Sequence, residues 1–227
     1  MGKDSSSINS CLLKVSQPDV EEITRVTYEK IALEYCQNTP SPEVRNVIVE
    51  SAAEFAYFLN PESTILVLGA GDGRDAEIFS KLGHRAIMLD YCSAMLSLAR
   101  RRLPFGEAVK ADFRNLPFTL SAFDGAWASA CLYHVRKSSL PHVISRVFET
   151  LRPGGVFYFN LRSGVGEKLD PHPRSFPVGG ARFYAFYSKS EVLDLVSRFD
   201  ILKLQSFNRV LKEDYFQLWI RKPQEVA

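Results

Sequence analysis

The segment ILVLGAGDGRD at residues 65–75 constrains the fold most, because an apolar run passes directly into three closely spaced glycines. The apolar residues predict a buried strand, and the glycines predict a tight turn that leads into a helix. Such a turn presents backbone N–H groups and a helix N-terminus to a ligand, since no Cβ blocks the approach. The segment therefore predicts a ligand-binding turn at the end of a first strand.

The spacing of these glycines restricts the ligand. The dinucleotide fingerprint G-x-G-x-x-G requires glycine in its sixth place, where this chain has Arg74. Asp72 and Asp75 would also lie beside a bound pyrophosphate and repel it. The turn therefore disfavours an NAD-dependent oxidoreductase.

Strand-like and helix-like segments alternate after residue 63, which predicts a parallel βαβ architecture in one domain. The expected strands cover residues 64–69, 85–90, 106–110, 123–129 and 154–160, and the expected helices 74–82, 93–102 and 138–151. Near the end, DILKLQSFNRV and DYFQLWIRK predict two strands joined by a turn. The last strand is therefore expected to be antiparallel to its neighbour.

The residues before this alternation predict two helices and a tail. Apolar residues recur at helical intervals over 19–36, where Asp19 is a suitable N-cap, and a second helix is expected over 42–59. The first 18 residues are polar and Ser-rich, and we expect a flexible tail. This tail matches the short M-G-x-x-x-[ST] pattern for N-myristoylation at Gly2.

Charge and cysteine content narrow the class of protein further. The 227-residue chain has a formal net charge of +2, which does not indicate a dedicated nucleic-acid binder. Its four cysteines are scattered, without CxxC or zinc-like spacing, which favours reduced thiols and a cytoplasmic location. No apolar run approaches the roughly 18 residues of a membrane helix, and the N-terminus lacks the apolar core of a secretory signal.

Two carboxylates follow the next two expected strands. Asp90 ends the second strand, where it can accept hydrogen bonds from both hydroxyls of a ribose, whether in NAD or in S-adenosylmethionine. Asp112 follows the third strand, where it can accept from the amino group of an adenine, and Phe113 can line the adenine pocket. Together with the glycine turn, these residues predict an adenosine site.

With these motifs in place, the chain resembles the class I S-adenosylmethionine-dependent methyltransferases. The resemblance covers about residues 64–160, with a weaker match through the final strands, and a lid-helix signature appears earlier as YEKIALEY (28–35). It rests on five motifs in the family's order: VLGAGDG, AIMLD, KADFRNLPF, FDGAWASACLYHV and LRPGGVFYFN. It implies a Rossmann-like, doubly wound sheet of seven mostly parallel strands, with the last strand antiparallel and N-terminal lid helices over 19–60.

The resemblance also implies S-adenosylmethionine as cofactor and a role for particular residues. The glycine turn would line the methionine and ribose part, Asp90 would hold the ribose, and Ser129 would lie near the methionine end. One departure stands at Val67, where the family usually has an acidic residue that anchors the methionine ammonium group. The ammonium group could instead be held by the carbonyl groups of the glycine turn or of Ser129, or by the hydroxyl group of Tyr28 or Tyr35. The full expected cofactor set is Gly69, Ala70, Gly71, Gly73, Asp90, Tyr91, Met95, Asp112, Phe113, Ser129, Tyr28 and Tyr35.

The acceptor is expected to be a small molecule held beyond the fourth strand. His134 and Tyr133 in LYHV are the candidate catalytic residues, because a general base is needed when the acceptor is protonated. Residues 162–187 form a long segment between a strand and a helix, and such loops tend to carry function. Its end, RFYAFY, predicts either an edge strand with an aromatic face or a substrate lid for a planar or anionic molecule; the candidate substrate residues are Arg162, Arg182, Tyr184 and Tyr187.

Other functions remain open at this stage. Methylation of tRNA or protein would need a basic surface, and the candidate clusters at 99–102, 136–139 and 172–174 are scattered. A catalytically silent S-adenosylmethionine-binding protein has Val67 as its support. The sequence does not identify the acceptor atom, because one fold can support many reactions.

Overall fold

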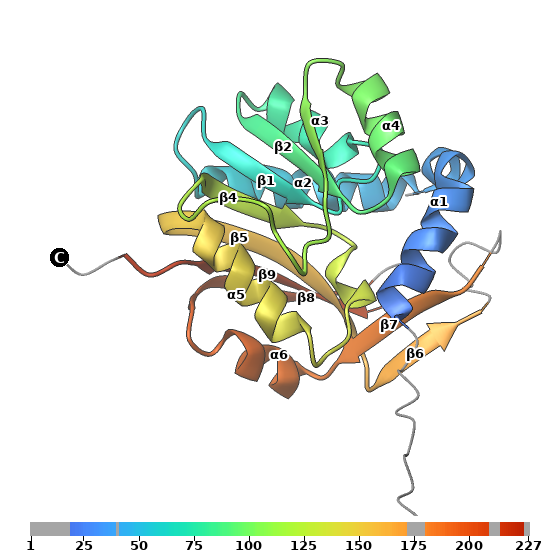
Figure 1. Ribbon diagram of the computed structural model, residues 1–227. Helices are drawn as coiled ribbons and strands as arrows, with labels where there is room; N and C mark the ends of the chain where they lie inside the picture. The colour runs from blue at the N-terminus through green and yellow to red at the C-terminus, as the bar shows by residue number, and fades with distance from the viewer. Residues whose placement is uncertain (1–18, 40, 172–179, 209–213, 225–227) are drawn as a thin grey trace, which may run out of the picture.

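We analysed a computed structural model of the chain, which describes residues 19–39, 41–171, 180–208 and 214–224. The expected tail with Gly2 and Cys11, the basic cluster at 172–174 and part of the expected substrate loop lie outside the described residues. Figure 1 shows the helices and strands, which are, in chain order, α1 (Val20–Asn38), α2 (Pro42–Tyr57), β1 (Thr64–Leu68), α3 (Arg74–Lys81), β2 (Arg85–Asp90), α4 (Ser93–Arg102), β3 (Glu107–Lys110), β4 (Phe123–Ala128), the 3-10 helix η1 (Leu132–His134), α5 (Leu140–Thr150), β5 (Leu151–Ser163), β6 (Glu167–Asp170), β7 (Arg182–Tyr187), α6 (Lys189–Val196), β8 (Asp200–Asn208) and β9 (Asp214–Arg221).

A mostly parallel sheet forms the centre of the molecule. Strand β1 pairs with β2 and β4, β2 pairs with β3, and β4 pairs with β5, all in parallel. The strand order therefore reverses between β1 and β4, which is where open α/β sheets bind ligands at the carboxyl ends of their strands. This confirms the Rossmann-like doubly wound fold that the sequence predicts.

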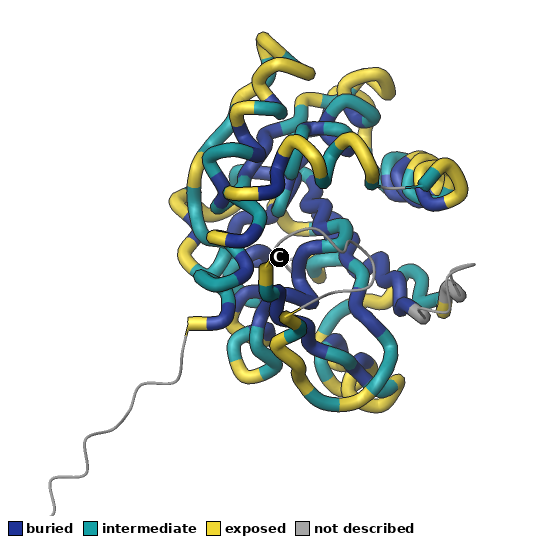
Figure 2. The backbone as a smooth tube through the Cα atoms, turned by 90° about the vertical axis from the view of Figure 1, so that its right-hand side faces the viewer, coloured by how far each residue is buried: buried dark blue, intermediate teal, exposed yellow. Residues whose placement is uncertain are grey.

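Helices cover both faces of this sheet, and the alternation along β1 shows why. Ile65 and Val67 point into a core cluster with Phe55 of α2 and Phe79 of α3, while Leu66 and Leu68 join the cluster that contains α5 and α6. A strand buried on both faces reads as a continuous apolar run. Figure 2 shows the resulting pattern, with buried backbone through the middle and exposed segments at the periphery.

The last two strands complete the sheet as the sequence predicts. Strand β9 is antiparallel to β5 over residues 156–162 and antiparallel to β8 on its other side. Strand β8 thus runs in the direction of β5, and β9 between them runs in the opposite direction.

The strand count differs from the expected seven because β6 and β7 add a hairpin. Strand β6 pairs with β7 in antiparallel fashion, and β7 continues the sheet by pairing in parallel with the last two residues of β5. The expected loop over 162–187 thus contains a strand with an aromatic face at RFYAFY. Because successive side chains of a strand point to opposite faces, Arg182 and Tyr184 face the cavity while Phe183 faces the core on the other side.

Helix α1 lies over the carboxyl ends of the strands, between α4 and β7 (Figure 1). Its N-cap is Asp19, as expected, whose carboxylate accepts from the backbone N–H of Glu22 at 3.1 Å. Two buried threonines attach it to β7: the Thr24 hydroxyl accepts from Phe183 N–H at 3.0 Å, and the Thr27 hydroxyl donates to the Ala181 carbonyl at 2.7 Å. The helix therefore forms one wall of the space above the glycine turn.

Candidate active site

A cavity of about 750 Å³ lies between α1, the glycine turn and the carboxyl ends of β1, β2 and β4. Helix α1, strand β7 and the segment after β4 close its sides. The structure brings together on its wall most of the expected site residues: Tyr28, Tyr35, Gly69, Ala70, Gly71, Asp90, Tyr91, Met95, Asp112, Phe113, Ser129, Tyr133, His134, Arg162, Arg182 and Tyr184. Residues from distant parts of the sequence therefore share one cavity.

Two expected site residues do not line this cavity. Gly73 has a φ of 81° at the start of α3, and a Cβ there would lie 3.1 Å from the Cα of Ala99. Its role in the structure is close packing of α3 against α4. Tyr187 is buried on the other side of β7, with the Lys137 Nζ 4.9 Å from its ring centroid.

Gly71 has the opposite environment from Gly73. Its φ is 56°, and no protein atom lies within 4 Å of the position that a Cβ would take. Because Gly71 lines the cavity, that space is open to a ligand that approaches the backbone.

Asp90 is held in place by backbone N–H groups on both of its carboxylate oxygens. Gly71 N–H donates to Oδ2 at 2.9 Å, and Cys92 N–H donates to Oδ1 at 2.8 Å. Burial raises the pKa of this carboxyl group, against the opposing effect of the backbone donors. Each oxygen keeps a lone pair, so Asp90 can still accept from two hydroxyl groups.

Asp112 is held in a similar way from the side away from the cavity. Arg114 donates to it through its backbone N–H and its Nε, each at 2.8 Å. Tyr91, Met95 and Phe113 supply apolar surface on the same part of the wall. A carboxylate beside apolar surface suits a planar base that carries an amino group.

At the other end of the cavity, the position of Val67 offers no polar group. Its side chain is 1% exposed and packs in the core, so it cannot contact a ligand. Asp75 of α3 lines the cavity instead, is 6% exposed, and accepts from Trp127 Nε1 at 2.8 Å and from Arg74 Nε at 2.9 Å. Asp75 is not among the site residues that the motifs predict, although its position as the second residue of α3, directly after the glycine turn, indicated that it lies close to a ligand in that turn.

His134 has defined partners on both ring nitrogens. Nδ1 lies 2.6 Å from the Phe183 carbonyl, which can only accept, so Nδ1 carries the proton. Nε2 lies 3.1 Å from the Tyr28 hydroxyl and accepts from it. Burial lowers the pKa of His134 to about 3, and the nearby Arg162 and Arg182 cations act in the same direction against the Phe183 hydrogen bond.

Aromatic rings surround the two buried arginines on the cavity wall. The Arg162 guanidinium lies 4.2 Å from the ring centroid of Tyr184 and 5.2 Å from that of Tyr133. The Arg182 guanidinium lies 5.5 Å from the ring centroid of Tyr28 and 5.8 Å from that of Tyr35. These distances are typical of cation–π interactions. This part of the cavity combines positive charge with flat aromatic surface.

The other chemistry of the site is limited. Among the described residues, no group of three or more His, Cys, Asp or Glu side chains could hold a metal ion. Burial raises the pKa of the Cys36 and Cys92 thiols to about 12, which makes them poor nucleophiles.

In the part of the chain that the structure describes, no helix is long and apolar enough to cross a bilayer.

Together, the fold and the cavity define a class of protein. A glycine turn after β1, a carboxylate at the end of β2 and a carboxylate beside apolar surface after β3 meet at one cavity, an arrangement that suits an adenosine-containing cofactor. The rest of the cavity is lined by Tyr184, His134, Arg162 and Arg182, and it lies next to this cofactor site.

Comparison with known proteins agrees with this class. Residues 65–155 match the family model of a methyltransferase domain. A malonyl-[acyl-carrier protein] O-methyltransferase from Serratia marcescens is 28% identical over 111 residues, which cover 48% of this chain and 43% of the relative. The chain thus spans less than half the length of the curated relatives that it matches first.

Solved structures show the same fold over a longer part of the chain. The 1,6-didemethyltoxoflavin-N1-methyltransferase of Burkholderia thailandensis, solved with 1,6-didemethyltoxoflavin and S-adenosylhomocysteine, is similar at a TM-score of 0.63 and 23% identity, covering 86% of this chain and 88% of that one. The [4+2]-cyclase SpnF is similar at a TM-score of 0.71 and 16% identity, covering 92% and 97%. Residues 65–155 therefore match a methyltransferase domain, and the fold of the chain is that of S-adenosylmethionine-dependent methyltransferases.

Proposed function

We propose that the protein transfers a methyl group from S-adenosylmethionine to a small-molecule acceptor. The observation that carries this proposal is the convergence of Gly71, Asp90 and Asp112 on one cavity. Gly71 leaves room for a ligand against the backbone, and Asp90 is oriented by two N–H groups while it keeps two lone pairs. These features support an adenosine-containing cofactor at this end of the cavity.

Each part of the cofactor has a proposed partner. Asp90 binds the ribose hydroxyls, Asp112 accepts from the adenine amino group, and Tyr91, Met95 and Phe113 cover the base. Asp75 replaces the missing acidic residue at position 67, because it is a buried carboxylate in the first turn of α3, directly after the glycine turn, on the cavity wall. The expected roles of Ser129 and Tyr35 near the methionine end remain part of this proposal.

The acceptor is proposed to be a planar or anionic molecule that binds beside β7. Arg162, Arg182 and Tyr184 line that side and offer positive charge with aromatic surface. Aromatic walls and a few polar groups are typical of pockets for small molecules. The similar Burkholderia enzyme was solved with a small molecule and S-adenosylhomocysteine together, which supports a small-molecule acceptor here.

The proposed catalytic role of the chain is mainly alignment and exclusion of water. When bound, S-adenosylmethionine supplies an electrophilic methyl group. His134 has its lone pair on Nε2, which makes it the candidate base for an acceptor that displaces the Tyr28 hydroxyl, although its lowered pKa makes it a weaker base than a free imidazole. Tyr133, whose ring centroid lies 4.7 Å from that of His134, is the second candidate.

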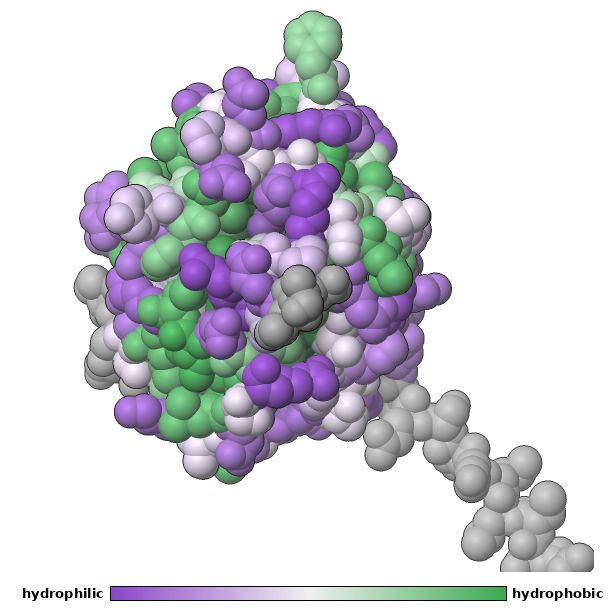
Figure 3. Space-filling model, turned by 90° about the vertical axis from the view of Figure 1, so that its left-hand side faces the viewer, coloured by the Kyte–Doolittle hydropathy of each residue, from purple (hydrophilic) through white to green (hydrophobic). Residues whose placement is uncertain are grey.

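The rival proposal of an RNA substrate has less support in the described residues. Lys137 Nζ pairs with Glu191 at 2.6 Å, and Arg102 pairs with Asp72 at 2.5 Å and with Glu77 at 3.3 Å. Members of the candidate basic clusters therefore already have anionic partners. Figure 3 shows that hydrophobic as well as hydrophilic residues reach the surface on the face away from α1.

Calorimetric binding of S-adenosylmethionine and S-adenosylhomocysteine to the protein and to Asp90→Ala tests the proposal. We expect micromolar binding that falls at least about tenfold in the variant, because two hydrogen bonds from the ribose to a charged acceptor are lost. Binding by the protein would then justify a screen of aromatic and anionic small molecules for methyl transfer. Absence of binding to the wild-type protein would contradict the proposal.

A further inference from the structure

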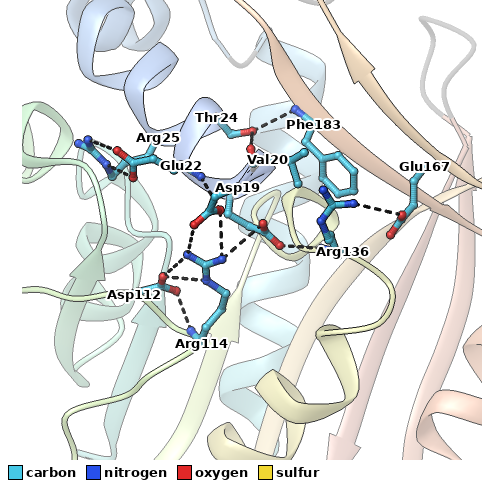
Figure 4. Close-up of polar contacts among 11 residues, drawn as sticks. Asp19, Val20, Glu22, Thr24, Arg25, Asp112, Arg114, Arg136, Glu167 and Phe183 are labelled. Atoms are coloured by element: carbon cyan, nitrogen blue, oxygen red, sulfur yellow. Dashed lines mark hydrogen bonds and ion pairs between the residues drawn. The ribbon is translucent and has the colours of Figure 1, made fainter. Parts of the chain in front are cut away.

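Arg114 lies behind the adenine side of the cavity and holds Asp112 with three donors. Its backbone N–H donates to Oδ1 at 2.8 Å, and Nε and Nη2 reach Oδ2 at 2.8 and 2.6 Å. Figure 4 shows this contact, with the Arg114 side chain next to Asp112. A charged donor with a planar fork fixes a carboxylate more firmly than a single neutral bond does.

The same guanidinium group also contacts the first turn of α1. Nη1 lies 3.3 Å from Asp19 Oδ1 and 3.4 Å from Glu21 Oε2, and Nη2 lies 3.5 Å from Asp19 Oδ2. Glu21 lines the cavity, and its second oxygen accepts from the Arg136 backbone N–H at 3.0 Å. Arg114 therefore joins the loop after β3 to the helix that closes the cavity, across about 95 residues of sequence.

The charge balance makes Arg114 the residue on which this junction depends. One cation lies among three carboxylates, so its removal leaves like charges facing one another without compensation. Single exposed ion pairs contribute little, but here the Arg114 side chain is only 27% exposed and is shared by several partners. Loss of the Arg114 side chain would remove the two donors on Oδ2 of Asp112, leave only the backbone donor on Oδ1, and release the first turn of α1 from the loop.

We infer that Arg114 is a positioning residue that couples recognition of the adenine amino group at Asp112 to docking of helix α1. This inference rests on the proposed function. The adenine amino group favours the fixed orientation of Asp112, and that orientation keeps the guanidinium fork toward Asp19 and Glu21. Coupling of this kind is reciprocal, so docking of α1 also strengthens adenine binding.

The fixed carboxylate further determines which base is accepted. S-inosylhomocysteine carries a carbonyl oxygen in place of the adenine amino group, and this oxygen would face Asp112 without a proton between them. A site built to accept from an amino group rejects the analogue that lacks it, since the buried partner is left unpaired. A mobile Asp112 would turn away from the carbonyl oxygen and discriminate less.

Calorimetry with S-adenosylhomocysteine and S-inosylhomocysteine tests the positioning role. We expect the wild-type protein to prefer the adenine compound by at least about thirtyfold. In Arg114→Gln, affinity for the adenine compound falls about tenfold while affinity for the inosine compound changes little, so the preference collapses. Arg146→Gln is the matched control, because Arg146 of α5 is similarly exposed and pairs with Glu149 three residues away on the same helix.

A second variant tests the link to α1 and does not depend on the folding of Arg114→Gln. In Asp19→Asn with Glu21→Gln, Asn keeps the N-cap while both α1 carboxylates lose their charge. We expect S-adenosylhomocysteine to slow hydrogen exchange along α1 in the wild-type protein and to do so much less in this variant. The preference of this variant for the adenine compound falls less than that of Arg114→Gln, because Arg114 still holds Asp112 while the contribution of α1 docking to adenine binding is lost.

The outcomes separate this inference from the proposed function. Failure of the wild-type protein to bind S-adenosylhomocysteine overturns both. Binding with an unchanged base preference in Arg114→Gln overturns the positioning role alone. Equal protection of α1 in the wild-type protein and in the double variant overturns the coupling.

Discussion

Gly71 and Gly83 share one backbone conformation but differ in what lies beside them. Both have positive φ, 56° and 84°, and neither has a protein atom within 4 Å of the position of an added Cβ. Gly71 lines the cavity, whereas Gly83 lies exposed in the turn between α3 and β2. A comparison of the two residues therefore separates backbone strain from ligand contact.

Gly71→Ala and Gly83→Ala are expected to lose a similar free energy of unfolding, about 1 kcal/mol, because a left-handed conformation disfavours a side chain. Only Gly71→Ala is expected to weaken S-adenosylhomocysteine binding, by at least about tenfold, since the new methyl group takes the space of the ligand. Urea unfolding and calorimetry measure the two effects. Equal affinity in both variants would show that no ligand approaches Gly71.

His134 gives a prediction about pH. Its pKa falls from an ordinary value near 6.5 to about 3 on folding, so the unfolded chain binds the proton more readily. The stability linked to neutral His134 is complete above about pH 6.5 and is lost as the pH falls toward 3. Between pH 7 and pH 5 the wild-type protein should lose up to about 2 kcal/mol of unfolding free energy that His134→Gln does not lose. Urea unfolding at both pH values measures this difference, and parallel losses in the two proteins would contradict it.

At the residue scale, local motifs predicted much of the site and long-range contacts did not. Asp90 and Asp112 could be found because a parallel sheet brings the ends of its strands together at one edge. Arg114 could not be assigned, because its partners at Asp19 and Glu21 lie far away in sequence. Gly73 and Tyr187 were expected at the site but pack elsewhere, since a motif does not tell which neighbour a side chain meets.

At the scale of elements, helix α4 receives its N-terminal cap from another helix. Its own N-cap residue, Cys92, makes no side-chain capping bond. Glu29 of α1 accepts from the backbone N–H groups of Ser93 at 3.0 Å and Ala94 at 3.1 Å. A carboxylate at a helix N-terminus also interacts favourably with the helix dipole.

Glu29→Gln is expected to lower the free energy of unfolding by about 1 kcal/mol, because the amide keeps one acceptor oxygen and loses the charge. The control is Glu34→Gln, an exposed change on the same helix, which should stay within about 0.5 kcal/mol of the wild-type value. Chemical unfolding of the three proteins compares them. If both variants lose the same free energy of unfolding, the effect comes from the charge of α1 in general and Glu29 is not a specific cap of α4.

The order of elements was predictable where periodicity and turn residues agree, as in β1, α3 and β2. The hairpin of β6 and β7 was not, because its glycines and prolines indicate a loop while RFYAFY indicates a strand. Pairing decides between these alternatives: β7 finds partners in β6 and in the end of β5. Pairing across the sheet is a tertiary property, which a local pattern does not contain.

At the scale of the whole molecule, occupation of the cavity should stabilise the entire fold. A ligand at 100 times its Kd adds about 2.7 kcal/mol to the stability of the protein that it binds. For a chain of this length, that corresponds to a rise in Tm of about 5–10 °C. Thermal unfolding with saturating S-adenosylhomocysteine measures the rise, and Asp90→Ala serves as the control that should show little. A shift below about 2 °C in the wild-type protein would contradict a single cooperative unit around the cavity.

In strand pairing, the hairpin of β6 and β7 joins β5 at two residue pairs, Arg162 with Phe186 and Ser163 with Tyr187, and it supplies one wall of the cavity. The strands that carry Gly71, Asp90 and Asp112 do not depend on it for their pairing. Substitutions of hairpin residues that face the cavity can therefore alter the shape and charge of that wall while the pairing of the strands on the cofactor side stays the same. During evolution, the acceptor of such a protein can change through one appended hairpin, without a new fold.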